Sequence, residues 1–289
     1  MTVGVLVLAH GTPARREDIE DFYTRIRRGR PPSAEELAEL ERRYEAIGGL
    51  SPFAERTTAQ VRGIANALGG DFVVRLGQKF ADPYIPDAVN ELIDAGVERI
   101  VGVVLAPHYS DASVGDYERR AVEAVDGRVP IDVIHSWHAE PALIDALATR
   151  VRDAWIDDAM LVVTAHSLPM TVIGNDTTYG DALAETARLI ARATGVTNYT
   201  VAWQSAGKAG GPWLGPSILD VIQEEAVTGT KAIVVCAAGF TSEHLEIAYD
   251  LDIEAKGLAD QVSIGFARTA SLDDDPAFCA LIAELVSAR

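Results

Sequence analysis

One pattern repeats along the whole chain: a short apolar run, then a longer segment with helical spacing. The runs are rich in Val, Ile and Leu on both faces, which is typical of strands covered on both sides in a mostly parallel sheet. We therefore predict an α/β fold. The expected strands cover residues 3–9, 72–76, 99–106, 131–134, 160–165, 199–203, 231–237 and 261–265. The expected helices cover residues 59–68, 84–95, 116–125, 141–154, 179–193, 216–227 and 276–289.

An internal similarity indicates two related halves. Residues 5–13 read Val-Leu-Val-Leu-Ala-His-Gly-Thr-Pro, and residues 161–169 read Leu-Val-Val-Thr-Ala-His-Ser-Leu-Pro. A looser similarity relates residues 103–110 to residues 234–242. Two doubly wound, Rossmann-like halves with a central cleft would leave such traces, although buried strands can also be similar by chance.

The expected domain boundaries follow from this similarity. Residues 1–139 form the N-terminal half, which includes an Arg-rich insertion over about 21–52 that we expect to hold substrate. Residues 140–270 form the C-terminal half with a metal site, and residues 271–289 form a closing helix.

Two histidines stand where ligands usually bind in such folds. His10 and His166 each follow the last apolar residue of a predicted strand, and the carboxyl ends of parallel strands line the ligand crevice. Each half therefore contributes one imidazole to the predicted cleft. Either histidine alone would more often be a partly buried structural residue.

An acidic segment follows the strand predicted at residues 231–237. Glu246, Asp250 and Glu254 are spaced four residues apart, so on a helix they form a column on one face. Like charges at this spacing destabilise a helix slightly, and a divalent cation would neutralise them. A solvated acidic face explains the same spacing. Glu246 is expected near His166, because both follow strand ends.

A local basic patch contrasts with the acidic chain. Six arginines gather in and after the first insertion, and their guanidinium groups suit the bidentate recognition of carboxylates; they are Arg25, Arg27, Arg28, Arg30, Arg42 and Arg43. An anionic organic ligand would fit this patch. The acidic stretch 35–41 offers the alternative that some of these arginines only form surface ion pairs.

Composition excludes several classes of protein. With 43 acidic and 25 basic residues, the net charge of −18 disfavours nucleic acid and anionic membranes as partners. The two cysteines, Cys236 and Cys279, are too few for a cysteine-held iron–sulfur cluster. The sequence shows neither a positively charged leader nor an apolar run of about 20 residues. We therefore expect a soluble, cytoplasmic protein with no stable membrane insertion.

The motifs collected so far resemble those of the ferrochelatases, in particular the soluble coproporphyrin type. The similar stretches run in order along nearly the whole chain. They are residues 9–13, 21–31, 43–52, 105–110, 113–117, 165–169, 203–205, 212–216 and 244–250. The run 43–52 and the His-Leu-Glu-x-x-Tyr-Asp motif that begins at His244 are specific to this family.

The resemblance implies roles for individual residues. His166 and Glu246 would be the catalytic and metal-binding pair, and Asp250 and Glu254 would continue an acidic path for the metal. The residues implied to hold the carboxylate arms of the porphyrin are Arg27, Arg28, Arg43, Tyr44, Ser51 and Tyr117. His10 would contact the substrate from the other face, where the family members considered carry a tyrosine. Phe80 replaces a histidine often found in the soluble enzymes.

The activity implied is insertion of Fe²⁺, as the substrate metal, into coproporphyrin III to give coprohaem in haem biosynthesis. The resemblance implies no organic cofactor and no iron–sulfur cluster, and a monomer would suffice. Two alternatives remain open. A sirohydrochlorin-type cobalt or iron chelatase is favoured by the His-Gly pair that ends the first strand, and a non-enzymatic haem or metal carrier belongs to a different class.

Overall fold

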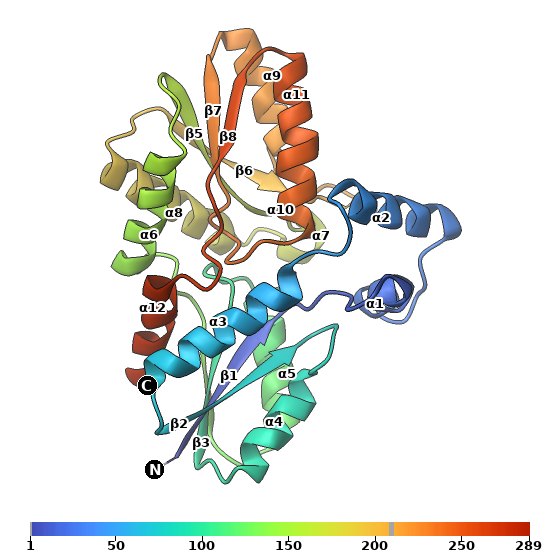
Figure 1. The fold of residues 1–289 in the computed structure, drawn as a ribbon, viewed down its shortest axis with the longest axis vertical. Helices are drawn as coiled ribbons and strands as arrows, with labels where there is room; N and C mark the ends of the chain where they lie inside the picture. The colour runs from blue at the N-terminus through green and yellow to red at the C-terminus, as the bar shows by residue number, and fades with distance from the viewer. Residues whose placement is uncertain (1, 208–210) are drawn as a thin grey trace.

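The computed structural model describes residues 2–207 and 211–289, which form two four-stranded parallel sheets (Figure 1). The strand order is β2-β1-β3-β4 in the first sheet and β6-β5-β7-β8 in the second. The strands are β1 (Val3–Ala9), β2 (Phe72–Gln78), β3 (Arg99–Val104), β4 (Ile131–Ile134), β5 (Ala159–His166), β6 (Tyr199–Gln204), β7 (Ala232–Cys236) and β8 (Gly265–Arg268).

The two sheets have the same topology. β1 and β5 are the first strands of their halves, and each lies between the second and third strands. β3 and β7 also occupy corresponding places. Both similarities found in the sequence therefore join topologically equivalent strands, which confirms the predicted α/β fold with two Rossmann-like halves.

Four helices cover the first sheet. They are α3 (Phe53–Leu68), α4 (Ile85–Asp94), α5 (Val114–Val125) and α12 (Pro276–Ser287). Side chains of β1 alternate between the two faces: Val5 and Val7 share a core with α3 and α12, whereas Leu6 and Leu8 share another with α4 and α5. This alternation explains the run that is apolar on both faces.

The second sheet is covered in the same way. One face packs on α6 (Pro141–Asp153) and α8 (Thr178–Thr194). The other packs on α9 (Ile218–Thr228), α10 (Leu245–Tyr249), a π-helical segment (η2, Asp250–Ala255) and α11 (Lys256–Gln261). The π-helical segment stands where a regular α-helix was expected.

Two helices pack against the sheet that they do not directly follow in the sequence. α6 follows the first sheet in sequence but packs on α8 and β7, whereas α12, at the end of the chain, packs on α3 and β3. A Cβ atom at Gly63 of α3 would lie 2.5 Å from the Cys279 sulfur of α12, so the small residue permits this close approach. One apolar cluster therefore spans both halves.

One strand was predicted at the wrong position. Residue 261 ends α11, and β8 begins only at Gly265, whose partner in the register is Ala232. Val262 and Ile264 pack in the core beside the end of α11, and Ser263 between them has a positive φ of 60°. Apolar residues that close the helix were therefore mistaken for a strand.

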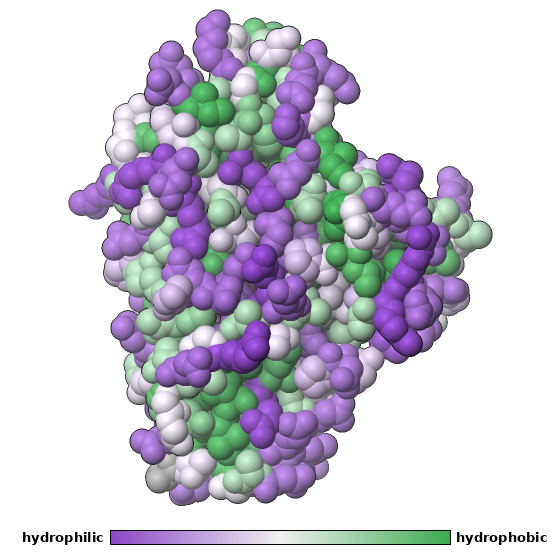
Figure 2. Space-filling model, viewed as in Figure 1, coloured by the Kyte–Doolittle hydropathy of each residue, from purple (hydrophilic) through white to green (hydrophobic). Residues whose placement is uncertain are grey.

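The insertion after β1 reaches across to the second half. It holds a short 3₁₀ turn (η1, Arg16–Asp18), α1 (Ile19–Ile26) and α2 (Ala34–Ala46), of which α2 lies beside α10 (Figure 1). Ile19 and Tyr44 pack there on Leu245 and Tyr249. Figure 2 shows hydrophobic surface where α2 approaches the second half, and a further hydrophobic area in the lower part of the same face. No helix within the described residues is long and apolar enough to cross a membrane.

Candidate active site

The end of β5 and the start of α10 bring a histidine and a glutamate together. His166 is the last residue of β5, and Glu246 is the second residue of α10. His166 Nε2 lies 3.5 Å from Glu246 Oε1, and both side chains are 36% exposed. The structure thus places these two predicted residues in contact and open to solvent.

Each residue of this pair shifts the pKa of the other. Burial opposes protonation of His166, but the charge of Glu246, a hydrogen bond to it and the Ser167 carbonyl together raise the pKa of His166 to about 9. Burial likewise opposes ionisation of Glu246, yet His166 holds the pKa of this carboxyl well below its usual value. At neutral pH the pair is therefore an imidazolium and a carboxylate.

A second histidine contacts the same carboxylate. His244 Nε2 lies 3.6 Å from Glu246 Oε2, so the carboxylate stands between two imidazoles. Phe240 and Phe53 flank the His244 ring at centroid distances of 4.8 and 5.8 Å. The sequence analysis gave His244 no role. The backbone of His244, the N-cap residue of α10, is extended. This conformation brings the His244 side chain near that of Glu246.

The three predicted carboxylates also come together. Asp250 is buried, and burial and the charges of Glu246 and Glu254 raise its pKa to about 6. Ser205 donates a hydrogen bond of 2.5 Å to Asp250, and an Arg43 nitrogen lies 3.9 Å away. The charges of Glu246 and Glu254 therefore both act on Asp250, which lies in a π-helical segment and not in a regular α-helix.

Arg43 joins the insertion to this column. Its guanidinium lies over the Tyr249 ring, 4.7 Å from the centroid, and 3.2 Å from Glu39. Arg27, by contrast, pairs with Glu36 at 2.7 Å, and Arg28 is exposed at the turn after α1. Some of these arginines thus form the surface ion pairs that the acidic stretch suggested.

The remaining predicted substrate residues are buried. Tyr44 is hydrogen-bonded to Thr12 and Tyr23. The Ser51 hydroxyl accepts a hydrogen bond of 3.2 Å from the Phe53 amide at the start of α3.

Tyr117 lies apart from these two, in the core beneath α4 and α5. The Lys79 ammonium stands 3.9 Å from its ring centroid and 2.7 Å from Asp116. Burial raises the pKa of Tyr117, which is therefore neutral.

His10 directly follows β1, as predicted, and its side chain is exposed. Its ring contacts those of Phe80 and Phe22, at centroid distances of 4.9 and 5.9 Å. Although the side chain is exposed, the surrounding protein desolvates the ring and lowers its pKa to about 4, and the charges of Glu246 and His166 also act on it. The two strand-end histidines therefore face a common region from different halves.

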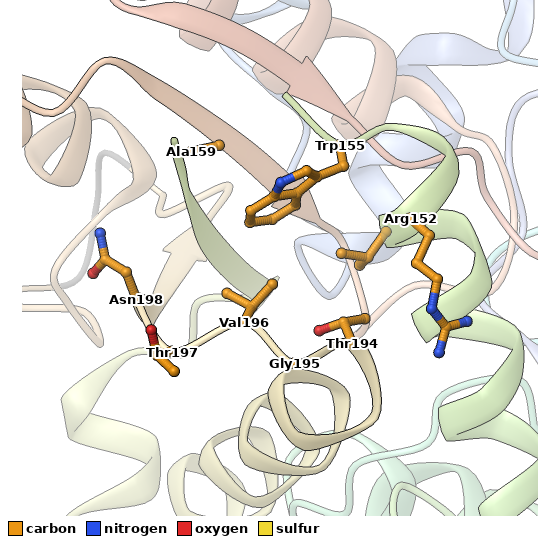
Figure 3. Close-up of a pocket in the computed structure, with 9 residues that line it drawn as sticks. Arg152, Trp155, Ala159, Thr194, Gly195, Val196, Thr197 and Asn198 are labelled. Carbon is orange, nitrogen blue, oxygen red and sulfur yellow. The ribbon is translucent and has the colours of Figure 1, made fainter. Parts of the chain in front are cut away.

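A separate hollow lies at the amino ends of β5 and β6, away from these residues. It has a volume of about 430 Å³, and its lining includes Trp155, Arg152 and Asn198 (Figure 3). Its nine lining residues include no histidine and no carboxylate, so the chemistry of the site is elsewhere. In the described part of the chain, no three His, Cys, Asp or Glu side chains are grouped to hold a metal ion.

Solved structures share the fold. SirB from Bacillus subtilis with Fe³⁺ matches 99% of this chain and 95% of its own, with a TM-score of 0.67 and 13% identity. CbiX, described as the terminal enzyme of sirohaem biosynthesis in denitrifying bacteria, matches 99% of this chain and 98% of its own, with a TM-score of 0.56 and 16% identity. At such identities the likeness concerns the fold alone.

Sequence relatives are much closer. The coproporphyrin III ferrochelatase of Anoxybacillus flavithermus is 40% identical over 98% of this chain and 95% of its own length. That of Listeria monocytogenes serovar 1/2a is 40% identical over 98% and 97%, respectively. The family model described as Ferrochelatase matches residues 2–289. Together with relatives that are 40% identical over nearly the whole chain, this match shows that the chain belongs to the ferrochelatase family.

Proposed function

We propose that this protein inserts Fe²⁺ into coproporphyrin III to give coprohaem, as a step of haem biosynthesis. The relatives that are about 40% identical over nearly their full length bear the name of this activity. The observation that carries the chemistry is the contact between His166 and Glu246, 3.5 Å apart and open to solvent.

Metal insertion exchanges one dication for two pyrrole N–H protons. In the resting pair His166 carries a proton, because its pKa is raised to about 9. An imidazole must lose this proton before it binds a metal, so arrival of Fe²⁺ at the pair releases it. Once metal has passed into the ring, His166 and the Glu246 carboxylate are free to accept pyrrole protons.

Asp250 gives these protons a way out. Its pKa of about 6 lets it take up and release protons near neutrality, and its charge is coupled to those of Glu246 and Glu254. The column Glu246, Asp250 and Glu254 thus serves as the path for cations: metal inward and protons outward. His244 positions Glu246 by contacting the carboxylate oxygen that faces away from His166.

The arginines would hold the carboxylate arms of the substrate. Arg27 and Arg43 are paired with Glu36 and Glu39 in partly exposed contacts. Such pairs contribute about 0–1 kcal/mol, so a substrate carboxylate can replace the partner at little cost. Arg28 is exposed beside them. Tyr44, Ser51 and Tyr117 are assigned to the same task on the family resemblance.

The cysteines support a reaction without an iron–sulfur cluster. The chain has two cysteines, both buried, whereas a cluster held by cysteines takes four thiolates. We propose a cytoplasmic monomer that uses no organic cofactor, since both halves contribute to the site from a single chain.

Two other functions compete with this one. A sirohydrochlorin chelatase is favoured by His10, by the His-Gly pair and by the fold shared with SirB. A metal or haem carrier would need His10 and His166 but no proton path.

Parallel insertion assays with coproporphyrin III, protoporphyrin IX and sirohydrochlorin separate these functions. We expect turnover that is fastest with coproporphyrin III. Turnover only with sirohydrochlorin would replace the proposal, and no turnover with any of the three would favour the carrier. A His166→Ala variant should lose activity with every substrate, whereas His135→Ala, on the surface beside Glu118, should retain it.

A further inference from the structure

The π-helical segment η2 is an irregular element within the candidate site. It covers Asp250–Ala255 between α10 and α11, and it directly follows the helix that carries Glu246. π-helical turns use i→i+5 hydrogen bonds, are rare and are frequent at functional sites. Asp250 and Glu254 both belong to this segment, so the contacts that hold η2 also determine how these two carboxylates lie relative to Glu246.

An arginine from the edge of the second sheet contacts η2. Arg268 is the last residue of β8, and its Nε and Nη2 atoms donate hydrogen bonds of 2.6 and 2.7 Å to the two carboxylate oxygens of Asp252. The planar guanidinium matches a carboxylate in this two-bond geometry, and both bonds are charge-assisted. Asp252 is the third residue of η2, so Arg268 holds the segment near its middle.

The same guanidinium also holds the loop before α10. Nη2 and Nη1 of Arg268 donate to Oε1 and Oε2 of Glu243, at 3.0 and 3.2 Å. Glu243 is fixed further, because Ser271 donates its hydroxyl to Oε2 at 3.0 Å and the Glu243 amide donates to Asp273 Oδ1 at 2.9 Å. We call the group of Arg268, Glu243 and Asp252 the Arg268 bridge.

The Arg268 bridge spans the stretch that carries the predicted catalytic carboxylate. Glu243 lies three residues before Glu246, and Asp252 lies two residues after Asp250. Because β8 is hydrogen-bonded to β7 in the second sheet, Arg268 extends from a fixed frame. Its side chain is 19% exposed and that of Glu243 is 21% exposed, so this ion pair is screened less than a pair on the open surface.

Removal of the guanidinium would upset the local balance of charge. The carboxylates of Asp252 and Glu243 contact the same cation, and without it they would repel each other. We expect η2 then to adopt the i→i+4 hydrogen bonds of its neighbours α10 and α11. That change turns Asp250 relative to Glu246 and breaks the hydrogen bond that Asp250 accepts from Ser205.

We propose that Arg268 is a positioning residue for metal insertion, which holds η2 in its π-helical form and so keeps Glu246 and Asp250 oriented for the metal. This inference rests on the proposed function. The guanidinium stays protonated, so Arg268 moves no proton and acts only through the Arg268 bridge. Its contribution should therefore appear in the metal affinity and in kcat, whereas the KM for coproporphyrin III should stay the same.

Zn²⁺ binding tests this inference without any porphyrin. Calorimetric titration of the full chain with Zn²⁺ alone measures the affinity of the donor pair, and His166→Ala should abolish that binding. Arg268→Gln should weaken it about tenfold, as loss of an outer contact to metal ligands commonly does, and should lower kcat by a similar factor. Arg268→Lys keeps the charge but not the fork, so it should recover part of the affinity. Amide hydrogen exchange of residues 250–255 should be faster in Arg268→Gln.

A double-variant cycle and a control variant test the cause. Asp252→Asn should weaken Zn²⁺ binding as Arg268→Gln does, and the double variant should be little weaker than either alone. Arg128 of the first half also joins two elements, because it donates to Asn90 Oδ1 at 3.0 Å and to the Ala124 carbonyl at 2.6 Å. Arg128→Gln should therefore lower the urea midpoint but leave Zn²⁺ affinity and kcat unchanged.

The outcomes separate this inference from the proposed function. Unchanged Zn²⁺ affinity and kcat in Arg268→Gln would overturn the positioning role and leave a structural ion pair. Additive losses in Arg268→Gln and Asp252→Asn would overturn action through the Arg268 bridge. If Arg268→Gln does not fold, Arg268→Lys and Asp252→Asn decide both points. Lack of iron insertion by the wild-type protein would overturn the proposed function, whereas the Zn²⁺ series would still show whether Arg268 positions the metal ligands.

Discussion

The two halves have the same sheet topology but extend it at different points. The first half places its insertion, α1 and α2, after its first strand, and this insertion carries the Arg27, Arg28 and Arg43 group. The second half has only the short helix α7 (Met170–Ile173) between β5 and α8, and its acidic segment follows the third strand, β7. The basic and acidic segments meet where Arg43 lies against Tyr249 and Asp250.

This difference shows where the function of each half is determined. The sheets supply equivalent strand ends, and the connecting segments decide what surrounds them. Aromatic rings contact His10, and the charges of Glu246, Lys79 and His166 act on it, whereas the charges that act on His166 are those of the carboxylates Glu246 and Asp250. The first half would thus hold the macrocycle, and the second would handle metal and protons. The predictions below test this division.

The largest expected difference lies in proton affinity. The pKa of His166 is raised to about 9 and that of His10 is lowered to about 4, which corresponds to roughly a 10⁵-fold difference in proton affinity. NMR titration of the ¹⁵N-labelled histidine rings in the metal-free protein should show both values. Fe²⁺ must displace the His166 proton, so affinity for the metal should rise with pH up to about 9.

A Glu246→Gln variant tests the cause of the pKa difference between His166 and His10. The His166 pKa should then fall, since burial remains and the carboxylate charge is gone. Two rings that both titrate near the ordinary value of 6.5 would remove the proposed distinction between the halves.

The second largest effect is expected in catalysis. Glu246→Gln should lower kcat by about 10²- to 10⁴-fold, because a proton acceptor and metal ligand is lost, and should change the KM for coproporphyrin III little. Steady-state kinetics measure both values. Glu185→Gln, at the surface beside His138, is the matched control. A rise in KM without a fall in kcat would assign Glu246 to substrate binding instead.

A smaller effect is expected from an arginine of the first half, and it should appear mainly in KM and less in kcat. Arg43→Gln should raise the KM for coproporphyrin III about 10- to 100-fold, since a charge-assisted hydrogen bond contributes about 1.5–3 kcal/mol, and should lower kcat less. Arg119→Gln, which breaks a surface pair with Asp111, provides the control. An unchanged KM would exclude Arg43 from the substrate site.

The smallest expected effect is the loss of stability when the N-cap serine of α2 or of α9 is replaced. Ser33 of α2 and Ser217 of α9 each form a capping box, with Glu36 and Asp220. Replacing either serine by Ala should cost about 1 kcal/mol. Ser33→Ala should open α2 locally, as faster hydrogen exchange there, and raise KM. Ser217→Ala should lower the urea midpoint without affecting KM. The same response in both variants would argue against a special role for α2.

The sequence predicts the fold well because burial on both faces leaves a strong signal. The strands β1 and β4 begin and end where the sequence predicted. The pair of His166 and Glu246 could also be expected, since each follows a strand that ends at the same sheet edge.

Other features depend on local geometry that spacing does not reveal. His244 contacts Glu246 because the N-cap is extended, and the π-helical segment interrupts an otherwise helical pattern. Arg27 finds a partner in Glu36 of the next helix. Tyr117 is a different case: its spacing with Val114, Ala121 and Val125 on one face of α5 indicates burial, and its role toward substrate stays a prediction from the family resemblance.

The exchange of α6 and α12 has a consequence for synthesis of the protein on the ribosome. The first sheet is complete once β4 has emerged, but α12, the helix that shields part of one face of β1 and β3, is translated after every other described strand and helix. Until then, this face of the nascent chain offers apolar surface to chaperones and to other chains. A ribosome stalled before Pro276 should therefore carry a chain that recruits chaperones, whereas release of the finished polypeptide should end that association.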